Sequence, residues 1–376
     1  MRLMVDEVLT DRALNRATLE RQLLLRRSNM RALDAVDHLV GMQAQVPLDP
    51  YAALWSRLEP FRADDLAQLL LHREVVRIAV MRTTIHLVTA DDALLLRPLM
   101  QPILTRELER HPQFGPALRG VDLKPALRFA RRLLAERPRT GPELRSAMAE
   151  RFPDVDPAAL AYACRNHLAL VQVPPRGVWG RSSQVTTTTA EAWLGRELVA
   201  EPSIDEVVLR YLAAFGPASV ADVTTWCRLS GMREVVGRLR SRLRTFRSVS
   251  GRELLDVVDA PRPDPRTPAP PRFLPEYDNV LLSHADRSRF VADPQRARLW
   301  SGSRLGRGCV LLDGSVLGPW HVERDRDTGA ATLVIVYPGA IARTRAAALA
   351  AEGRRLLRFL APDAGERDVR MEAAEP

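Results

Sequence analysis

The spacing of hydrophobic residues predicts a repeated order of elements: a helix, a turn, two more helices and then a pair of strands. In the middle of the chain, apolar residues at helical spacing predict helices over 123–135, 141–152 and 157–170. β-rich segments around a Pro-Pro-Arg-Gly turn then predict a hairpin over 171–189. This order is typical of a winged helix-turn-helix, in which the third helix and the hairpin, or wing, face DNA.

The same order recurs on both sides of this unit. Downstream, helices are predicted over 203–215, 219–230 and 232–243, followed by two strands around Ser250-Gly251. Upstream, the order is stretched over residues 11–88. The helices predicted there cover 16–26, 31–42, 51–58 and 64–72, and a single strand-like run covers 75–88.

We therefore expect a mainly α fold with some β structure, built from three tandem winged helix-turn-helix units and a C-terminal β-rich segment. Residues 260–272 are proline-rich and predict a linker or a surface loop. Residues 308–337 predict a meander of short strands, and a helix over about 341–359 precedes a polar tail. The expected domains are the three units and the C-terminal segment, with boundaries at 1–118, 119–198, 199–259 and 260–376.

The charge of the chain favours a polyanionic partner. The 55 Lys and Arg against 46 Asp and Glu give a formal net charge of +9 and an isoelectric point near 10.3. Lys124 is the single lysine, so codon bias in a GC-rich genome is the alternative explanation of the arginine excess. If the charge serves DNA binding, the arginines on the third helices and wings should meet phosphates.

These arginines are the candidate DNA contacts, and a solvated helix face is the alternative for each. Two more arginines flank the tip of the C-terminal hairpin, where an arm could enter a groove, although an ordinary charged hairpin explains them equally well. The candidates are Arg165, Arg176 and Arg181 in the second unit, Arg238, Arg240 and Arg242 in the third, and Arg324 and Arg326 in the hairpin.

Several function classes lack support in the sequence. The three cysteines are far apart, which argues against a disulfide framework, and neither they nor the seven histidines have metal-ligand spacing, so we expect no metal. The glycines match neither a P-loop nor a dinucleotide fingerprint, so we expect no cofactor. No apolar run is long enough for a membrane span, and early acidic residues argue against a signal peptide, so we expect a cytoplasmic protein without membrane partners.

One segment with candidate chemistry is DHLVGMQAQVPLDPYAALWSRL, residues 37–58. Gln43 and Gln45 stand on either side of one small residue at the end of a predicted helix, a spacing that can aim both side chains the same way. Paired amides can hold a water molecule or a base edge. The spacing alone is equally compatible with two surface glutamines.

This segment resembles the catalytic motif of the AlkZ-like winged-helix DNA glycosylases, in their Gln-x-Gln branch. Three further blocks resemble the same family in the same order: MRTTIHLVTADDA at 81–93, LPEYDNVLLSHADR at 274–287 and VLLDGSVLGPW at 310–320. The resemblance implies three tandem winged helices, catalysis by Gln43 and Gln45, and DNA binding by Arg82, Thr84 and His86. A structural role for His86 is equally compatible with its apolar strand, and Asp278 is expected to cap a helix or form a turn.

The implied activity is hydrolysis of the N-glycosidic bond of cationic N7- or N3-alkylated purines in duplex DNA. It would extend to unhooking interstrand crosslinks made by bulky alkylating natural products, as in self-resistance. Lyase chemistry needs an amine, and Lys124 matches no family block, so we expect a monofunctional enzyme. We also expect a monomer that joins the nucleoid only when bound to DNA. The alternative is a non-catalytic winged-helix transcriptional regulator.

Overall fold

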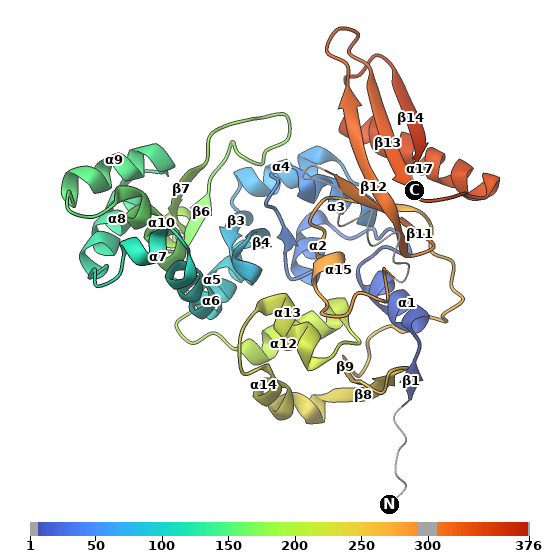
Figure 1. Ribbon diagram of the computed structural model, residues 1–376, viewed down its shortest axis with the longest axis horizontal. Helices are drawn as coiled ribbons and strands as arrows, with labels where there is room; N and C mark the ends of the chain where they lie inside the picture. The colour runs from blue at the N-terminus through green and yellow to red at the C-terminus, as the bar shows by residue number, and fades with distance from the viewer. Residues whose placement is uncertain (1–6, 292–306, 375–376) are drawn as a thin grey trace, which may run out of the picture.

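The computed structural model describes residues 7–291 and 307–374, and these form a mixed α/β protein. The described strands make three sheets of three, five and six strands. In Figure 1 the second helix–hairpin region forms a lobe at the left, the third lies below the centre, and the C-terminal strands project at the upper right. Across these ranges, no helix is both long and apolar enough to cross a membrane.

The first region begins earlier than its pattern predicts, because the Thr10 side chain caps the first helix by accepting from the amide of Ala13. The strand-like run over 75–88 forms a hairpin of two strands. Its chain turns at Arg82 and Thr83, both of which have positive φ. The elements are α1 (Asp11–Arg21), α2 (Ala32–His38), β2 (Met42–Gln43), α3 (Asp49–Arg57), α4 (Ala63–Leu71), β3 (Val75–Ala79), a 3₁₀ turn (Met81–Thr83) and β4 (Ile85–Thr89).

The second region follows the predicted order closely. Three short helices lead into it, and Thr140 begins α9 with a capping box closed by Glu143. The elements are α5 (Ala90–Leu99), α6 (Gln101–Arg110), α7 (Phe114–Ala117), α8 (Lys124–Glu136), β5 (Arg139–Thr140), α9 (Gly141–Arg151), α10 (Pro157–His167), β6 (Leu170–Gln172), β7 (Thr186–Thr189) and α11 (Ala190–Leu194).

The hairpins of these two regions join into one six-stranded sheet, in the order β2-β4-β3-β6-β7-β5. The joint is the pairing of β3 with β6, in which Ile78 lies opposite Val171. The wing of the second region therefore completes a sheet that begins at the Gln-Ala-Gln segment. Local patterns cannot predict this pairing, because it joins strands more than 90 residues apart.

The third region has three helices and a hairpin, as expected, with the third helix ending earlier than predicted. An additional strand, β1 (Val8–Leu9), pairs in parallel with β8 and completes the three-stranded sheet. The elements are α12 (Ile204–Phe215), α13 (Val220–Cys227), α14 (Met232–Leu239), a 3₁₀ turn (Arg240–Arg242), β8 (Leu243–Ser248) and β9 (Glu253–Val257).

The C-terminal segment is a five-stranded sheet covered by one long helix, α17. The polar tail forms β14, which pairs in parallel with β13 (Figure 1). The elements are β10 (Arg272–Leu274), α15 (Asn279–Leu282), β11 (Gly308–Leu312), β12 (Ser315–Arg324), β13 (Ala331–Tyr337), α17 (Arg343–Leu360) and β14 (Arg367–Ala373).

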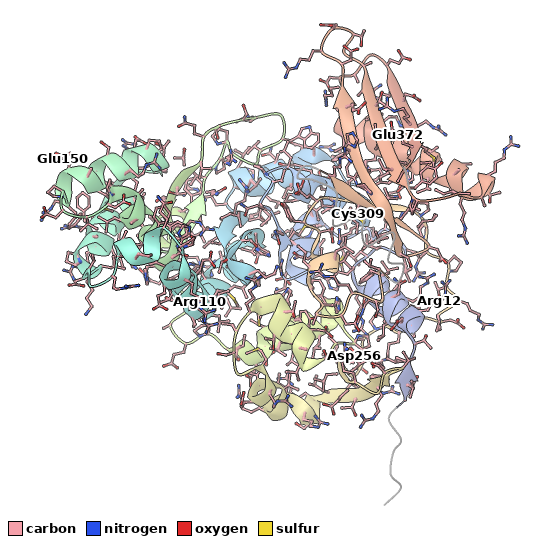
Figure 2. The ribbon with its side chains drawn as sticks, viewed as in Figure 1. Arg12, Arg110, Glu150, Asp256, Cys309 and Glu372 are labelled. Atoms are coloured by element: carbon pink, nitrogen blue, oxygen red, sulfur yellow. The ribbon has the colours of Figure 1, made fainter. Side chains whose placement is uncertain are left out.

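Long-range packing holds these regions together. One hydrophobic cluster contains Leu54 of the first region and Trp226 of the third. The proline-rich segment is a surface loop on α1, where the carbonyls of Pro265 and Thr267 accept from arginines of that helix. Figure 2 marks Asp256 below α1 and Cys309 on β11, and the three cysteines, Cys164, Cys227 and Cys309, are all buried and free.

Candidate active site

The Gln-Ala-Gln segment is held at the edge of the six-stranded sheet. Gln43 lies opposite His86, and the amide of Ala44 donates to the carbonyl of Ile85 at 2.8 Å. The carbonyl of Ala44 accepts from Nη2 of Arg77 at 2.8 Å. Gly41 leads into this strand with a φ of +83°, and a Cβ there would lie 2.5 Å from the Val88 side chain, so the turn requires glycine.

The side chain of Gln43 is anchored by Arg82. Nη2 of Arg82 lies 2.9 Å from Oε1 of Gln43, and Gln43 is only 7% exposed. A guanidinium can donate but not accept, so the atom facing it must be the amide oxygen. The amino group of Gln43 is therefore the end that remains available.

The side-chain oxygen of Gln45 is also anchored, in this case by a backbone amide. The amide of Ile85 donates to Oε1 of Gln45 at 3.3 Å, and the residue is exposed. A backbone N–H can only donate, so the Gln45 atom that faces it must be the side-chain oxygen. Within the described residues, the amide nitrogen of neither glutamine bonds to another protein group. The pair thus presents two amino groups as hydrogen-bond donors.

Arg82 occupies the centre of a polar cluster beside Gln43. It is 8% exposed and adopts a φ of +56°. The same Nη2 atom also lies 3.2 Å from Nε2 of His86 and 3.0 Å from Oδ1 of Asn279. Among the described residues no carboxylate forms an ion pair with Arg82, and burial lowers the pKa of its guanidinium to about 10.

His86 is a neutral member of this cluster. Its Nδ1 lies 3.0 Å from the carbonyl of Thr84, which can only accept, so Nδ1 carries the proton and Nε2 accepts from Arg82. Burial, reinforced by the positive charge of Arg82, lowers the pKa of His86 to about 3. His86 is therefore a satisfied structural histidine in this geometry, which favours that alternative over a proton-transfer role.

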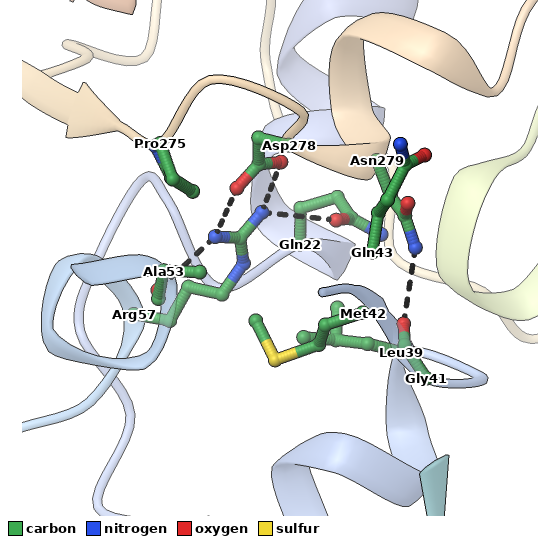
Figure 3. A pocket seen from close by; sticks show the side chains of 10 residues that line it. All are labelled: Gln22, Leu39, Gly41, Met42, Gln43, Ala53, Arg57, Pro275, Asp278 and Asn279. Atoms are coloured by element: carbon green, nitrogen blue, oxygen red, sulfur yellow. Dashed lines mark hydrogen bonds and ion pairs between the residues drawn. The ribbon is translucent and has the colours of Figure 1, made fainter. Parts of the chain in front are cut away.

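A second polar cluster closes the inner side of the segment (Figure 3). Asp278 caps α15 by accepting from Val280, as expected, and its two oxygens each lie 2.8 Å from the guanidinium of Arg57. Asn279 donates to the carbonyl of Gly41 at 3.1 Å. Between this cluster and Gln43 lies a cavity of about 10 Å³, which is the size of a single water molecule.

Asp49 places a further carboxyl group near the Gln-Ala-Gln segment. It is the first residue of α3, four positions after Gln45, and its Oδ2 is buried without a hydrogen-bond partner. Burial, together with the negative charges of Glu276 and Asp278, raises the pKa of Asp49 to about 7. The carboxyl group therefore titrates close to neutral pH.

Most of the predicted DNA-contacting arginines bond to neighbouring protein groups. Arg165 donates to the carbonyl of Thr83, Arg176 to that of Ser183 and Arg324 to that of Leu360. Thr84 donates to the carbonyl of Met81, while Arg181 and Arg326 are exposed. The three arginines of the third region form surface ion pairs, Arg238–Asp205, Arg240–Glu253 and Arg242–Glu206. A phosphate contact by any of them remains a prediction.

Sequence reasoning missed two residues that hold the segment in place, Arg77 and Asn279, and a third, Arg57, that pairs with Asp278 beside it. Arg77 carries a readable signal, because it stands alone between Val76 and Ile78 in a strand of otherwise apolar residues. A charged side chain at such a position can be buried only if it has a specific hydrogen-bond acceptor. Nothing local could have indicated Asn279, whose partner Gly41 is 238 residues away.

Two amides whose oxygens accept from the β3–β4 hairpin form the centre of the candidate site. The family model "DNA glycosylase AlkZ-like" matches residues 36–359, so the chain belongs to this family of DNA glycosylases. Among solved structures, the DNA glycosylase AlkZ of Streptomyces sahachiroi is similar, with a TM-score of 0.73 and 20% identity, covering 98% of this chain and 100% of that one. At this identity the likeness establishes the fold. A search of curated proteins finds no match.

Proposed function

We propose that the chain is a monofunctional, metal-independent glycosylase that releases purines alkylated at N7 or N3 from duplex DNA, with Gln43 and Gln45 as its catalytic residues. Interstrand crosslinks formed by bulky alkylating natural products fall within the same chemistry, because each end of such a crosslink is an alkylated purine. We further propose that it acts as a cytoplasmic monomer that associates with the nucleoid when bound to DNA.

The observation that carries this proposal is the orientation of the two amides. Both oxygens are used by protein donors, Arg82 for Gln43 and the Ile85 amide for Gln45, so the two amino groups are left to face the substrate. One amino group can donate to the oxygen of a water molecule, whose second lone pair then points at C1′ of the deoxyribose, while the other amino group orients the deoxyribose. This arrangement positions the water but cannot take up its proton strongly.

A positioned water is sufficient only for a reactive substrate. An N7- or N3-alkylated purine is a cation, so the C1′–N bond breaks with its electron pair moving to the base, which leaves neutral. The new C1′–O bond forms from the water, whose proton passes to solvent. No general acid is needed on the leaving group, and normal purines, which would leave as anions, should stay uncut.

A lyase step would require a protein amine at the sugar. Lys124 is the only lysine, and it is exposed at the start of α8 in the second region. We therefore expect an intact abasic site as the product. Borohydride treatment during the reaction should trap no protein–DNA adduct, and a trapped adduct would contradict the monofunctional assignment.

The test is release of base from a duplex with one N7-methylguanine. Gln45→Ala should lower the rate by about 100-fold or more, the range seen when one positioning donor is lost. Gln113→Ala, which alters an exposed glutamine outside the site, is the matched control and should react like the unmodified protein. Equal rates for all three proteins would refute the assignment.

A further inference from the structure

The loop between β6 and β7, residues 173–185, is the wing of the second region, and its middle packs against the first region. In Figure 1 it extends from the lobe at the left toward that region. The ring centroid of Trp179 lies 4.9 Å from that of Tyr51 on α3 and 5.2 Å from that of Phe359 on α17, and Val178 is only 3% exposed. In a winged helix the wing faces DNA, whereas the middle of this one is turned toward the protein. We call it the second wing loop.

One buried hydroxyl group joins the turn of the second wing loop to α3. Oη of Tyr51 donates to the carbonyl of Gly177 at 2.8 Å and accepts from the backbone amide of Trp179 at 3.0 Å. A hydroxyl group can do both at once, so it matches the acceptor and the donor of the turn. Burial raises the pKa of Tyr51 to about 12, so the hydroxyl keeps its proton at neutral pH. The loop is thus bonded to the helix that begins four residues after Gln45.

The same turn packs against Arg77, which bonds the catalytic segment. Gly177 has a φ of +85°, and a Cβ there would lie 2.9 Å from Cδ of Arg77. The turn therefore requires glycine both for its backbone conformation and for its contact with the arginine. Nη2 of Arg77 in turn donates to the carbonyl of Ala44, the residue between the two catalytic glutamines, at 2.8 Å.

The orientation of Arg77 depends on packing more than on hydrogen bonds. Its Nε and Nη1 atoms are buried and have no partner among the described residues, so the bond to Ala44 is the one that holds the guanidinium there. Burial, reinforced by the charge of Arg176, lowers the pKa of Arg77 to about 10, which leaves it a cation at neutral pH. A long side chain with one such bond keeps a single rotamer where its neighbours exclude the others, and Gly177 is one of those neighbours.

We propose that the second wing loop supports the catalytic segment: its turn, bonded to Tyr51, keeps Arg77 against the carbonyl of Ala44. Tyr51, Gly177 and Arg77 are positioning residues, since all three are buried and act on the glutamines through the backbone between them. The proposal rests on the proposed function and adds to it the residues that hold the amide pair in register. Weakening this support should slow the chemical step and leave DNA affinity unchanged.

The first test compares two glycines of the loop. Both have positive φ, +85° at Gly177 and +70° at Gly180, but a Cβ at Gly180 would meet nothing within 4 Å. Replacement by alanine therefore strains the backbone at both positions and displaces Arg77 at only one. With a duplex carrying one N7-methylguanine, Gly177→Ala should lower the single-turnover rate about tenfold or more and keep duplex affinity within about twofold, while Gly180→Ala changes neither. Equal rates for the two variants would overturn the proposal.

The second test asks whether the effect passes through Arg77. Arg77→Met removes the guanidinium and keeps an unbranched stem, so it should itself lower the rate about tenfold or more. Tyr51→Phe, which keeps the ring and loses both hydrogen bonds, should lower the rate about three- to tenfold in the unmodified protein. Added to Arg77→Met, neither Tyr51→Phe nor Gly177→Ala should cost more than about twofold, because no guanidinium remains to be displaced. Fully additive losses would overturn the proposal.

The third test needs no DNA and no catalysis. The amide of Ala44 donates to the carbonyl of Ile85 at 2.8 Å, so its hydrogen–deuterium exchange reports how firmly the segment is held. Gly177→Ala should speed this exchange at least about tenfold, and Gly180→Ala should leave it unchanged. If the unmodified protein released no base, the proposed function would fail, and the exchange measurement would still decide on the support. Unchanged exchange in Gly177→Ala would overturn it.

Discussion

Two pairs of buried arginines, Arg21 and Arg57 on one hand and Arg77 and Arg82 on the other, differ in how their charge is balanced. Behind the active site, Arg57 is paired with Asp278, and Arg21 is paired with Asp256, with side chains of all four about 1% exposed or less. Along the catalytic segment, Arg77 and Arg82 are also buried but bond only neutral oxygens and a histidine nitrogen in the described chain. An unbalanced buried charge is expensive and is tolerated best where function requires it.

The two groups of arginines therefore have different roles. The balanced pairs join distant segments, since Arg57 and Asp278 are 221 residues apart, and they hold the frame. The unbalanced arginines hold the oxygen of Gln43 and the carbonyl of Ala44, so they fix the catalytic geometry at the expense of stability. Substitutions in the two regions should therefore affect different measurements.

The largest effect on stability is expected from Asp278→Ala. This change leaves the guanidinium of Arg57 buried and unpaired and removes the cap of α15, so unfolding free energy should fall by about 3–5 kcal/mol. Urea unfolding followed by circular dichroism measures it. A loss below about 1 kcal/mol would mean that the Arg57–Asp278 pair contributes little to the stability of the fold.

Arg82→Lys should show the opposite profile. The ammonium cannot reach Gln43, His86 and Asn279 together, so the amide of Gln43 loses its fixed orientation. The single-turnover rate of base release should fall about 10- to 100-fold, while DNA affinity and the urea midpoint change little. An equal loss of rate and affinity would instead make Arg82 a DNA contact.

Asp49→Asn tests the raised pKa of Asp49 through the pH dependence of stability. Because the pKa of Asp49 is raised to about 7 in the folded protein, its protonated form favours folding at low pH, and that advantage disappears as pH rises through 7. The asparagine variant should match the unmodified protein near pH 4.5 and exceed it by about 1–3 kcal/mol at pH 8. Parallel stability curves across this range would contradict the raised pKa.

The smallest effect is expected at the arginine-rich surface of the third region. Arg242→Ala breaks an exposed ion pair with Glu206, so stability should change by no more than about 0.5 kcal/mol. If Arg242 also meets a phosphate, the slope of log affinity against log salt should decrease by about 0.9. An unchanged slope would leave the ion pair as the only role of Arg242.

Local patterns predicted the elements well where the information is local. The helices of the second region and their hairpin follow from apolar spacing and the Pro-Pro-Arg-Gly turn, and the Gln-Ala-Gln segment was found by its motif. The six-stranded sheet and β14 could not be predicted, because both depend on pairing with distant strands, and the alternation of Val369 and Met371 is diluted by charged residues.

The orientation of the glutamines was equally out of reach of the sequence. Two amides at i and i+2 can present oxygens or amino groups, and only the donors placed beside them decide which. Those donors, Arg82 and the amide of Ile85, come from the hairpin that follows about 40 residues later. The sequence pattern identified the two glutamines, and the fold determines which end of each side chain is available.

The most direct test of the central claim is single-turnover release of N7-methylguanine by the Gln43→Ala, Gln45→Ala double variant, with DNA affinity measured on the same duplex. The account predicts that the unmodified protein releases the base, and that the variant binds the duplex with similar affinity but releases none above background. Release by the variant at the unmodified rate would show that the anchored amide pair is not the catalytic centre.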